Sequence, residues 1–228
     1  TFWPVLGWTL IWAVFATVTN YVLGLALALL INRKGTRAKG FWRFMFVLSI
    51  AVPQFVTLLS MRTIFNTNGP VNVILRTIGL IGPTESIPFF TDPLIAKITI
   101  ILINIWIGVP YTMLSTTGIL QNIPGELYEA AKIDGAGAIR RFRDITMPTV
   151  LAVAAPVFIT QYTGNFNNFT MIYLFNDGGP GSAGGGAGQT DILISWIFKL
   201  TTNNSPQYSL AAALTIIVSF IVIGVSLI

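Results

Sequence analysis

Residues 5–31 read VLGWTLIWAVFATVTNYVLGLALALLI, a run without a single charged side chain. An α-helix rises about 1.5 Å per residue and the hydrocarbon core of a bilayer is about 30 Å thick, so this run is long enough to cross a membrane. Its apolar residues are continuous, whereas the strands of membrane β-barrels alternate in polarity. The stretch therefore predicts a transmembrane helix and sets the fold class of the chain.

Four more apolar runs of similar length follow the first one. They cover residues 41–65, 94–120, 148–175 and 207–228. The runs contain Gly, Ser and Thr, small residues that let membrane helices approach closely. We therefore predict an all-α integral membrane protein, a bundle of about five transmembrane helices that forms a single transmembrane domain over residues 1–228.

The composition excludes several classes of protein. Only 9% of the 228 residues are charged and 54% are hydrophobic, which does not suit a soluble domain. Cysteine and histidine are both absent, so we expect no disulfide, no thiolate nucleophile, no histidine base and no Cys/His metal site. No catalytic residue and no bound cofactor are predicted.

The positive charges are distributed unevenly between the loops. Five basic residues lie in 32–43 and four in 121–147, against one each in 66–93 and 176–206: Arg33, Lys34, Arg37, Lys39, Arg43; Lys132, Arg140, Arg141, Arg143; Arg76; Lys199. Basic loops stay in the cytoplasm, so the N-terminus of this segment is expected outside and the C-terminus inside. The net charge of +5 is thereby explained by topology and does not indicate nucleic acid as a partner.

The loop 121–147 has structure of its own in the sequence. Pro124 and Glu126 suit a first helical turn, Asp134-Gly135 ends the helix, and a second amphipathic segment precedes Pro148. The residues alone leave two interpretations open. The unit is either a handle that a cytoplasmic partner grips, or a basic amphipathic loop that rests on lipid head groups.

The segment 161–173, QYTGNFNNFTMIY, is unusually polar for a membrane span. Gln161, Asn165 and Asn168 have i, i+4, i+7 spacing and are expected on one stripe of a helix, flanked by aromatic residues. Such a stripe should face the bundle interior or a wet cavity. One or two amides would be explained by interhelical hydrogen bonds, as we expect for Asn20. Three amides beside aromatic rings suit a neutral, hydroxyl-rich ligand.

The stretch GGPGSAGGGAGQTD, residues 178–191, contains G-x-G-x-x-G at Gly179, Gly181 and Gly184. No strand precedes it, so it is rejected as a nucleotide site. We expect a flexible linker in the outer loop 176–206.

The segment EAAKIDGAGAIRRFRDITMP, residues 129–148, resembles the EAA loop of binding-protein-dependent ABC importer permeases. Met147 departs from the Leu that the family usually has, a volume-conserving change. In that family the segment is a cytoplasmic coupling helix that docks on an ATPase subunit. The resemblance implies coupling roles for five residues: Glu129, Ala130, Ala131, Asp134 and Gly135.

GNFNNF and NDGGP, together with NIWIGVPYTM at 104–113, are similar to the larger permease subunit of maltose and maltodextrin importers. The resemblance implies eight sugar-contacting positions: Gln161, Gly164, Asn165, Asn168, Asn104, Ile107, Gly108 and Tyr111. Gln161 stands where the best-known members have Ser, and Gly164 where they have Phe. Loss of that aromatic platform is expected to widen the site or to shift the preferred sugar.

The resemblance implies a multi-pass subunit of the bacterial inner membrane that forms half of a carbohydrate pathway. Its implied partners are a homologous second permease, two cytoplasmic ATPase subunits that use ATP and Mg²⁺, an extracytoplasmic sugar-binding protein, the sugar and membrane lipid. The resemblance also gives the glycine-rich loop 178–191 a second interpretation, an outer loop that meets the binding protein, beside the linker that we favour. The chain itself is expected to catalyse no reaction. Family members usually carry a further span, so we expect residues to be missing at both ends.

Three alternatives stay open at this point. One is an ABC permease for another small polar solute, and another is a non-transporting membrane scaffold. A channel or secondary carrier is the third, but coupling to protons or sodium usually needs an acid inside a span, and no Asp or Glu lies well inside one here.

Overall fold

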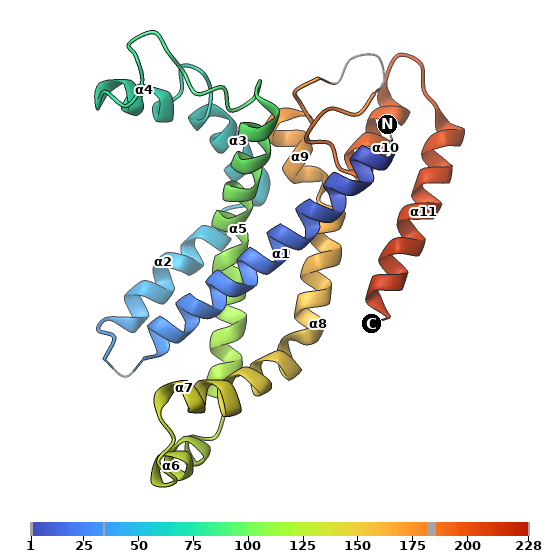
Figure 1. Ribbon diagram of the computed structural model, residues 1–228. Coiled ribbons are helices and arrows are strands. Elements are labelled where there is room, and N and C mark those ends of the chain that lie inside the picture. Colours follow the sequence, from blue (N-terminus) through green and yellow to red (C-terminus); the bar gives the residue numbers. More distant parts are fainter. Residues whose placement is uncertain (1, 34, 182–185, 228) are drawn as a thin grey trace. The chain divides into compact units, whose positions relative to one another are not determined.

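The computed structural model describes residues 2–33, 35–181 and 186–227, and every regular element in these ranges is helical (Figure 1). Lys34 and Gly184, which the sequence patterns include, lie outside the described residues. The elements in chain order are α1 Phe2–Asn32, α2 Lys39–Ala51, α3 Gln54–Ile64, α4 Pro70–Thr77, α5 Pro93–Gln121, α6 Gly125–Ile133, α7 Ala138–Arg141, the π-helix η1 Phe142–Thr146, α8 Met147–Phe166, α9 Phe169–Asn176, α10 Leu193–Thr202 and α11 Tyr208–Ser226.

Four helical stretches of the described residues are long and apolar enough to span a membrane. They are Phe2–Asn32, Pro93–Gln121, Ala138–Asn176 and Tyr208–Ser226. The pair α2 and α3 adds a fifth if it is counted as one span. The predicted bundle of about five transmembrane helices is therefore confirmed in helix content and length.

The predicted continuous span 41–65 is wrong in one respect, because it is interrupted between Ala51 and Gln54. Pro53 lacks a backbone N–H and disfavours helical geometry at the residue before it, Val52. Pro53 has a ψ of 133° and stands at the N-cap of α3. The proline thus ends one helix and starts the next.

The chain divides into two compact units. The first consists of Thr1–Ala16, Val52–Trp106 and Tyr162–Ile228, and the second of Thr17–Ala51 and Ile107–Gln161. The core of the first unit joins the start of α1 to α10 and α11 through buried apolar side chains. They include Val5, Ala13, Phe166, Leu193, Leu200 and Leu214.

The second unit packs α1, α5 and α8 around buried apolar side chains. Tyr21, Leu25, Val150 and Ala154 form one cluster. The helices α1 and α5 also meet at small residues, because a Cβ placed on Gly24 would lie 2.6 Å from Thr112 Cβ. This close approach is the kind that small residues permit between membrane helices.

Candidate functional site

Helix α6 and the turn after it have the geometry that the sequence predicts, with one shift at the start. Pro124 is the N-cap of α6 and not a residue of its first turn. Asp134 is the C-cap, and Gly135 follows with a φ of +76°, a left-handed conformation that favours glycine. The predicted coupling residues Glu129, Ala130 and Asp134 are exposed, while Ala131 is half-buried.

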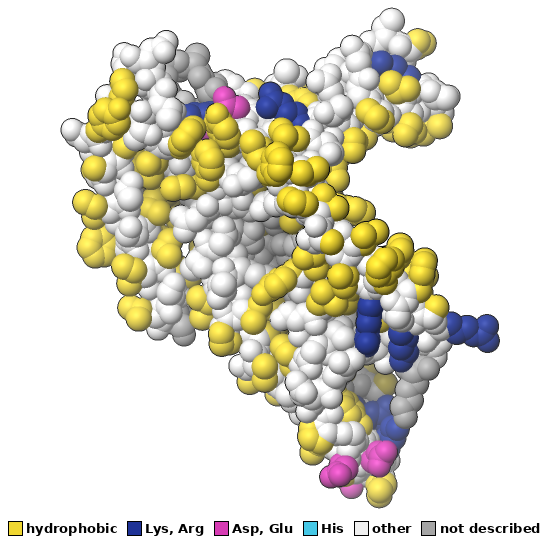
Figure 2. Space-filling view, turned by 180° about the vertical axis from the view of Figure 1, so that it is seen from behind, with side chains coloured by type: hydrophobic (Ala, Val, Ile, Leu, Met, Phe, Trp, Pro, Cys, Tyr) yellow, Lys and Arg dark blue, Asp and Glu magenta, His cyan; other side chains and the backbone are white. Residues whose placement is uncertain are grey.

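The apolar side chains of this loop point largely outward. Ile133 is 87% exposed, Ile139 is 83% exposed and Leu127 is 49% exposed. In Figure 2, Asp and Glu side chains lie at the lower tip, where Figure 1 places α6, and several Lys and Arg side chains lie above them. An exposed apolar surface rimmed by charged groups is typical of a protein interaction site.

Two hydrogen bonds connect α6 and its turn to the segment that starts α8. The hydroxyl oxygens of Tyr128 and Thr146 lie 2.8 Å apart, and Thr146 is buried. Arg141 Nη1 donates to the carbonyl oxygen of Ala136 at 2.9 Å. These two contacts tie α6 to η1 and the turn after α6 to α7, the two segments that precede α8. Sequence reasoning missed Tyr128 and Thr146, although a hydroxyl on a short interfacial helix is a signal for such a contact.

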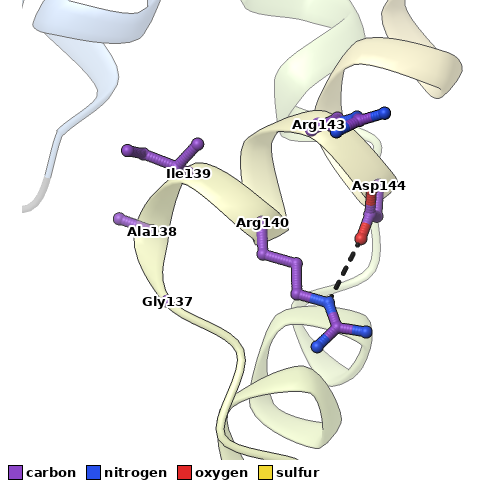
Figure 3. A pocket seen from close by; sticks show the side chains of 6 residues that line it. All are labelled: Gly137, Ala138, Ile139, Arg140, Arg143 and Asp144. Carbon is purple, nitrogen blue, oxygen red and sulfur yellow. Dashed lines mark ion pairs between the residues drawn. The ribbon is translucent and has the colours of Figure 1, made fainter.

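An exposed ion pair lies on the same segment. Arg140 Nε is 3.5 Å from an Asp144 carboxylate oxygen, and both side chains are more than half exposed. Figure 3 shows Arg140 reaching Asp144 while Ile139 points away from the pair. Exposed pairs of this kind contribute little to stability.

Four of the predicted sugar-contacting residues lie in the second unit. Gln161 Nε2 donates to Thr112 Oγ1 at 3.0 Å, which links α8 to α5. Gly108 lies against Asn20, since a Cβ at Gly108 would be 2.1 Å from Asn20 Nδ2. Tyr111 is 53% exposed and Ile107 is partly exposed. Asn20 is buried between helices, as packing glue should be, but its Oδ1 has no hydrogen-bond partner among the described residues.

The other four lie in the first unit and do not form the predicted stripe. Helix α8 ends at Phe166, and Asn168 is the N-cap of α9, where its Oδ1 accepts from Met171 N at 3.2 Å. Asn168 therefore does not continue the helix that carries Gln161 and Asn165. An asparagine side chain competes with the helical backbone for hydrogen bonds, and this preference for caps explains the break.

Asn165 and Asn104 are both buried. The carbonyl oxygen of Asn165 accepts from the indole N–H of Trp12 at 2.8 Å. Asn104 Nδ2 has no partner among the described residues. Gly164 is exposed and has open space around its Cα, with nothing within 4 Å of an added Cβ.

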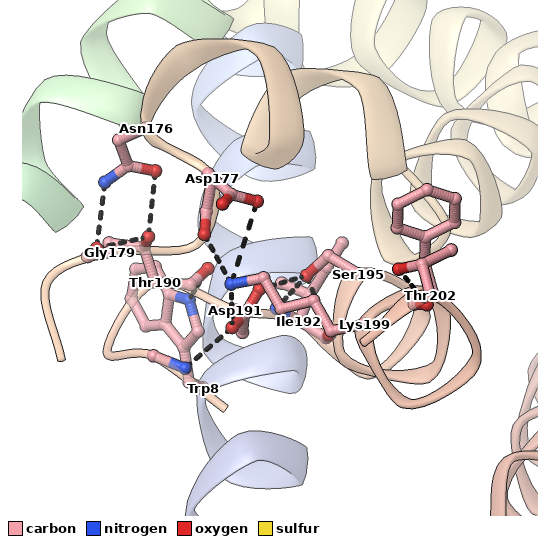
Figure 4. Close-up of polar contacts among 12 residues, drawn as sticks. Trp8, Asn176, Asp177, Gly179, Thr190, Asp191, Ile192, Ser195, Lys199 and Thr202 are labelled. Carbon is pink, nitrogen blue, oxygen red and sulfur yellow. Dashed lines mark hydrogen bonds and ion pairs between the residues drawn. The ribbon is translucent and has the colours of Figure 1, made fainter. Parts of the chain in front are cut away.

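The glycine-rich loop is not a flexible linker where it is described. Thr190 N donates to Gly178 O, and Gln189 N donates to Pro180 O. The carboxylate of Asp191 is completely buried and accepts hydrogen bonds from Gly188 N at 2.6 Å, Ser195 Oγ at 2.8 Å and Lys199 Nζ at 2.8 Å (Figure 4).

The absence of a side chain at Gly178 leaves the space that the Asp191 carboxylate occupies. Its φ is +72°, and a Cβ there would lie 1.9 Å from Asp191 Oδ1. The loop also holds α1, because Trp8 Nε1 donates to Thr190 O at 3.1 Å and Leu193 N donates to Thr9 Oγ1 at 3.0 Å. The glycines thus permit close approach in a packed structure, and the linker prediction is wrong for the described residues.

Curated proteins are similar to this chain in sequence. The chain is 54% identical over 232 residues to the maltodextrin transport system permease protein MdxF of Bacillus subtilis, with 100% of this chain and 53% of that protein covered. It is 48% identical over 229 residues to the galactooligosaccharides transport system permease protein GanP of the same organism, with 100% and 54% covered. The chain spans about half the length of the curated relatives it matches.

A solved structure shares the fold at low sequence identity. The crystal structure of a bacterial ABC transporter that imports the acidic polysaccharide alginate aligns with a TM-score of 0.84 and 21% identity, over 98% of this chain and 76% of that chain. The family model for the binding-protein-dependent transport system inner membrane component matches residues 20–228. The chain therefore belongs to the family of inner membrane components of binding-protein-dependent transport systems.

Proposed function

We propose that the chain is the membrane-spanning permease subunit of an ATP-driven importer of neutral oligosaccharides, with maltodextrins as the first candidates. It forms half of the pathway, and a homologous permease forms the other half. Two cytoplasmic ATPase subunits supply energy from ATP and Mg²⁺, and an extracytoplasmic binding protein delivers the sugar. The names of the related permeases support the sugar class, and they include both maltodextrin and galactooligosaccharide systems.

The observation that carries the proposal is the construction of α6. It presents exposed Glu129 and Ala130 together with the exposed apolar side chains Leu127 and Ile133. The Tyr128–Thr146 hydrogen bond connects it to the start of α8. An ATPase that moves α6 would therefore move α8, which carries Gln161, Gly164 and Asn165 of the predicted sugar-contacting residues.

The chemistry of the predicted contact residues supports a neutral substrate. Amide groups donate and accept hydrogen bonds, whereas none of the eight residues carries a charge that would select an ion. The buried amide nitrogen of Asn104 lacks a partner among the described residues, and since buried amides usually have one, a sugar hydroxyl is the partner that we propose. The assignment of all eight residues to one sugar site belongs to the proposal.

The basic loops support the orientation of the subunit. Loops 32–43 and 121–147 carry most of the positive charge, and such loops stay on the cytoplasmic side. In the proposed orientation α6 lies in the cytoplasm, where an ATPase can reach it. The N-terminus of the segment is then outside and its C-terminus inside.

The coupling role is tested with Glu129→Gln in the reconstituted transport complex. The readout is ATP hydrolysis and sugar uptake stimulated by sugar-loaded binding protein. We expect Glu129→Gln to lower both at least tenfold while the complex still assembles. The matched control is Glu126→Gln, because Glu126 is an exposed acid of the same helix outside the EAA segment. Equal activity of the two variants would show that the coupling assignment is wrong.

The turn is tested with a second matched pair. Gly135→Ala forces an alanine into a positive φ, whereas Gly137 has a φ of −66° and equally open surroundings. We expect Gly135→Ala to reduce stimulated hydrolysis and Gly137→Ala to leave it unchanged. A channel or secondary carrier would give uptake that is independent of the ATPase subunits in all of these variants.

The substrate assignment is tested with Gly164→Phe, which introduces the aromatic residue that the resemblance implies for the best-known maltose permeases at this position. Nothing lies within 4 Å of a Cβ at this position, so the ring does not clash at its base. We expect the complex to remain active and its preference among oligosaccharides of different length to shift. Asn167→Phe on the neighbouring exposed position is the control. An unchanged preference in Gly164→Phe would argue against a position beside the sugar.

A further inference from the structure

A second polar feature of the chain lies beside α6 and shares Tyr128, Glu129 and Thr146 with the proposed coupling contacts. It is a pocket of about 640 Å³ within the second unit. Its walls come from the end of α1, the end of α5, one side of α6 and the segment from α7 to η1. The residues that line it include Leu29, Leu30, Asn32, Arg33, Leu120, Tyr128, Glu129, Lys132, Arg141, Phe142 and Thr146.

The pocket carries an excess of positive charge. Arg33, Lys132 and Arg141 line it, against the single acid Glu129. None of these four side chains forms an ion pair with another residue in the described part of the chain. Arg141 uses one N–H on the carbonyl of Ala136 and retains further donors. Three cations around one acid leave a site that favours an anion.

Two further cations, Lys39 and Arg43, contact a residue that lines the pocket. Asn32, which lines the pocket, accepts from Arg43 Nη2 at 2.6 Å through its side chain and from Lys39 Nζ at 3.2 Å through its carbonyl oxygen. Arg43 Nε is buried and has no hydrogen-bond partner among the described residues. The positive groups are thus held close to the pocket by Asn32.

The remaining wall is apolar and lies where membrane spans end. Leu29 and Leu30 belong to the last turns of α1, and Leu120 to the last turn of α5. Both helices are spans by length and hydropathy, so their ends mark the surface of the hydrocarbon region. Phe142 adds an aromatic ring from η1. A small free anion would use the cations and leave this apolar wall uncovered.

We propose that this pocket binds the phosphate head group of an anionic phospholipid, with phosphatidylglycerol as the probe. Arg33, Lys132 and Arg141 contact the phosphate, and the leucine side chains contact the glycerol and the upper acyl chain. Basic pockets between transmembrane helices bind anionic head groups in this way. The proposal rests on membrane insertion alone and does not depend on which solute the protein transports.

The experiment measures lipid binding to the intact detergent-solubilised transport complex by native mass spectrometry during titration with phosphatidylglycerol. We expect the wild type to retain a tightly bound lipid that Arg33→Gln/Lys132→Gln binds about 25-fold more weakly, since each cation near a membrane surface contributes about fivefold. Lys132→Gln alone should weaken binding about fivefold. Both side chains are exposed, so the fold is not expected to change.

The matched control is Arg37→Gln, which removes a charge from the same loop as Arg33 but from a residue that does not line the pocket. It should retain the lipid as the wild type does. Equal loss in Arg37→Gln and Lys132→Gln would show a diffuse surface charge and overturn the proposal. Binding of glycerol 1-phosphate as tight as that of phosphatidylglycerol would show a free-phosphate site and would also overturn it.

Discussion

The cation of the region 176–206 and the cations of the basic loops 32–43 and 121–147 have opposite surroundings. Lys199, in the loop region 176–206, has a side chain that is only 14% exposed and lies 2.8 Å from the fully buried carboxylate of Asp191. Arg33 and Lys132, in the basic loops, are exposed and form no ion pair with any other described residue. A count of charges per loop treats these residues alike, whereas their surroundings separate a structural cation from cations left open to a partner.

The difference follows from the cost of burying a charge. A buried carboxylate is tolerated only with compensating donors, and Asp191 receives hydrogen bonds from Gly188, Ser195 and Lys199. An exposed cation is solvated and needs no partner. The charges of Asp191 and Lys199 therefore stabilise the region 176–206 itself, whereas the basic loops 32–43 and 121–147 leave their cations open to other molecules.

The largest expected effect comes from breaking the buried network. Asp191→Asn removes the buried negative charge that Lys199 faces at 2.8 Å and leaves this largely buried ammonium with only the exposed carboxylate of Asp177, 3.9 Å away. Breaking one partner of a buried pair costs about 3–5 kcal/mol. We expect the purified complex to show a marked fall in its thermal unfolding midpoint.

Asp177→Asn is the matched control for Asp191→Asn. The Asp177 side chain is 57% exposed and its carboxylate lies 3.9 Å from Lys199. Its loss should lower the midpoint by much less, because the pair is screened by solvent. Equal shifts for the two variants would show that burial of Asp191 does not set the strength of the network.

A smaller effect is expected where the loop around α6 contacts α8. Tyr128→Phe removes the 2.8 Å hydrogen bond to Thr146 and should cost about 1 kcal/mol of stability. The larger consequence is for coupling, so we expect more ATP to be hydrolysed per sugar transported. Tyr208→Phe is the control, because Tyr208 is 65% exposed. An unchanged ratio of ATP to sugar in Tyr128→Phe would show that this bond does not transmit movement.

The sequence predicted the elements whose signals are local. The continuous apolar runs located the spans, and Asp134-Gly135 located the turn after α6, which the structure confirms with Gly135 at φ +76°. The break at Pro53 was equally local, but the apolar run around it concealed it. The prediction of one helical stripe over 161–168 was wrong, because Asn168 caps the start of α9 instead of continuing α8.

Long-range contacts were beyond the sequence. The glycines of 178–191 have the composition of a linker, and only the position of Asp191 beside Gly178 shows that they allow close approach. The same holds for the pocket beside α6, whose cations come from positions as far apart as Arg33 and Arg141. No local pattern brings those residues together, so sequence reasoning assigned most of the cations to topology and left open only that the loop 121–147 rests on lipid head groups.

The smallest effect on the thermal midpoint is expected from the loss of the exposed ion pair between α7 and η1. Arg140→Gln removes the 3.5 Å contact with Asp144, whose side chain is 55% exposed. Arg143→Gln removes another exposed cation of the same segment, one that forms no ion pair with a described residue. Because solvent screens such pairs, the two variants should have indistinguishable thermal midpoints, close to that of the wild type. A clear loss in Arg140→Gln alone would show that this loop, too, uses a charge pair to hold its own structure.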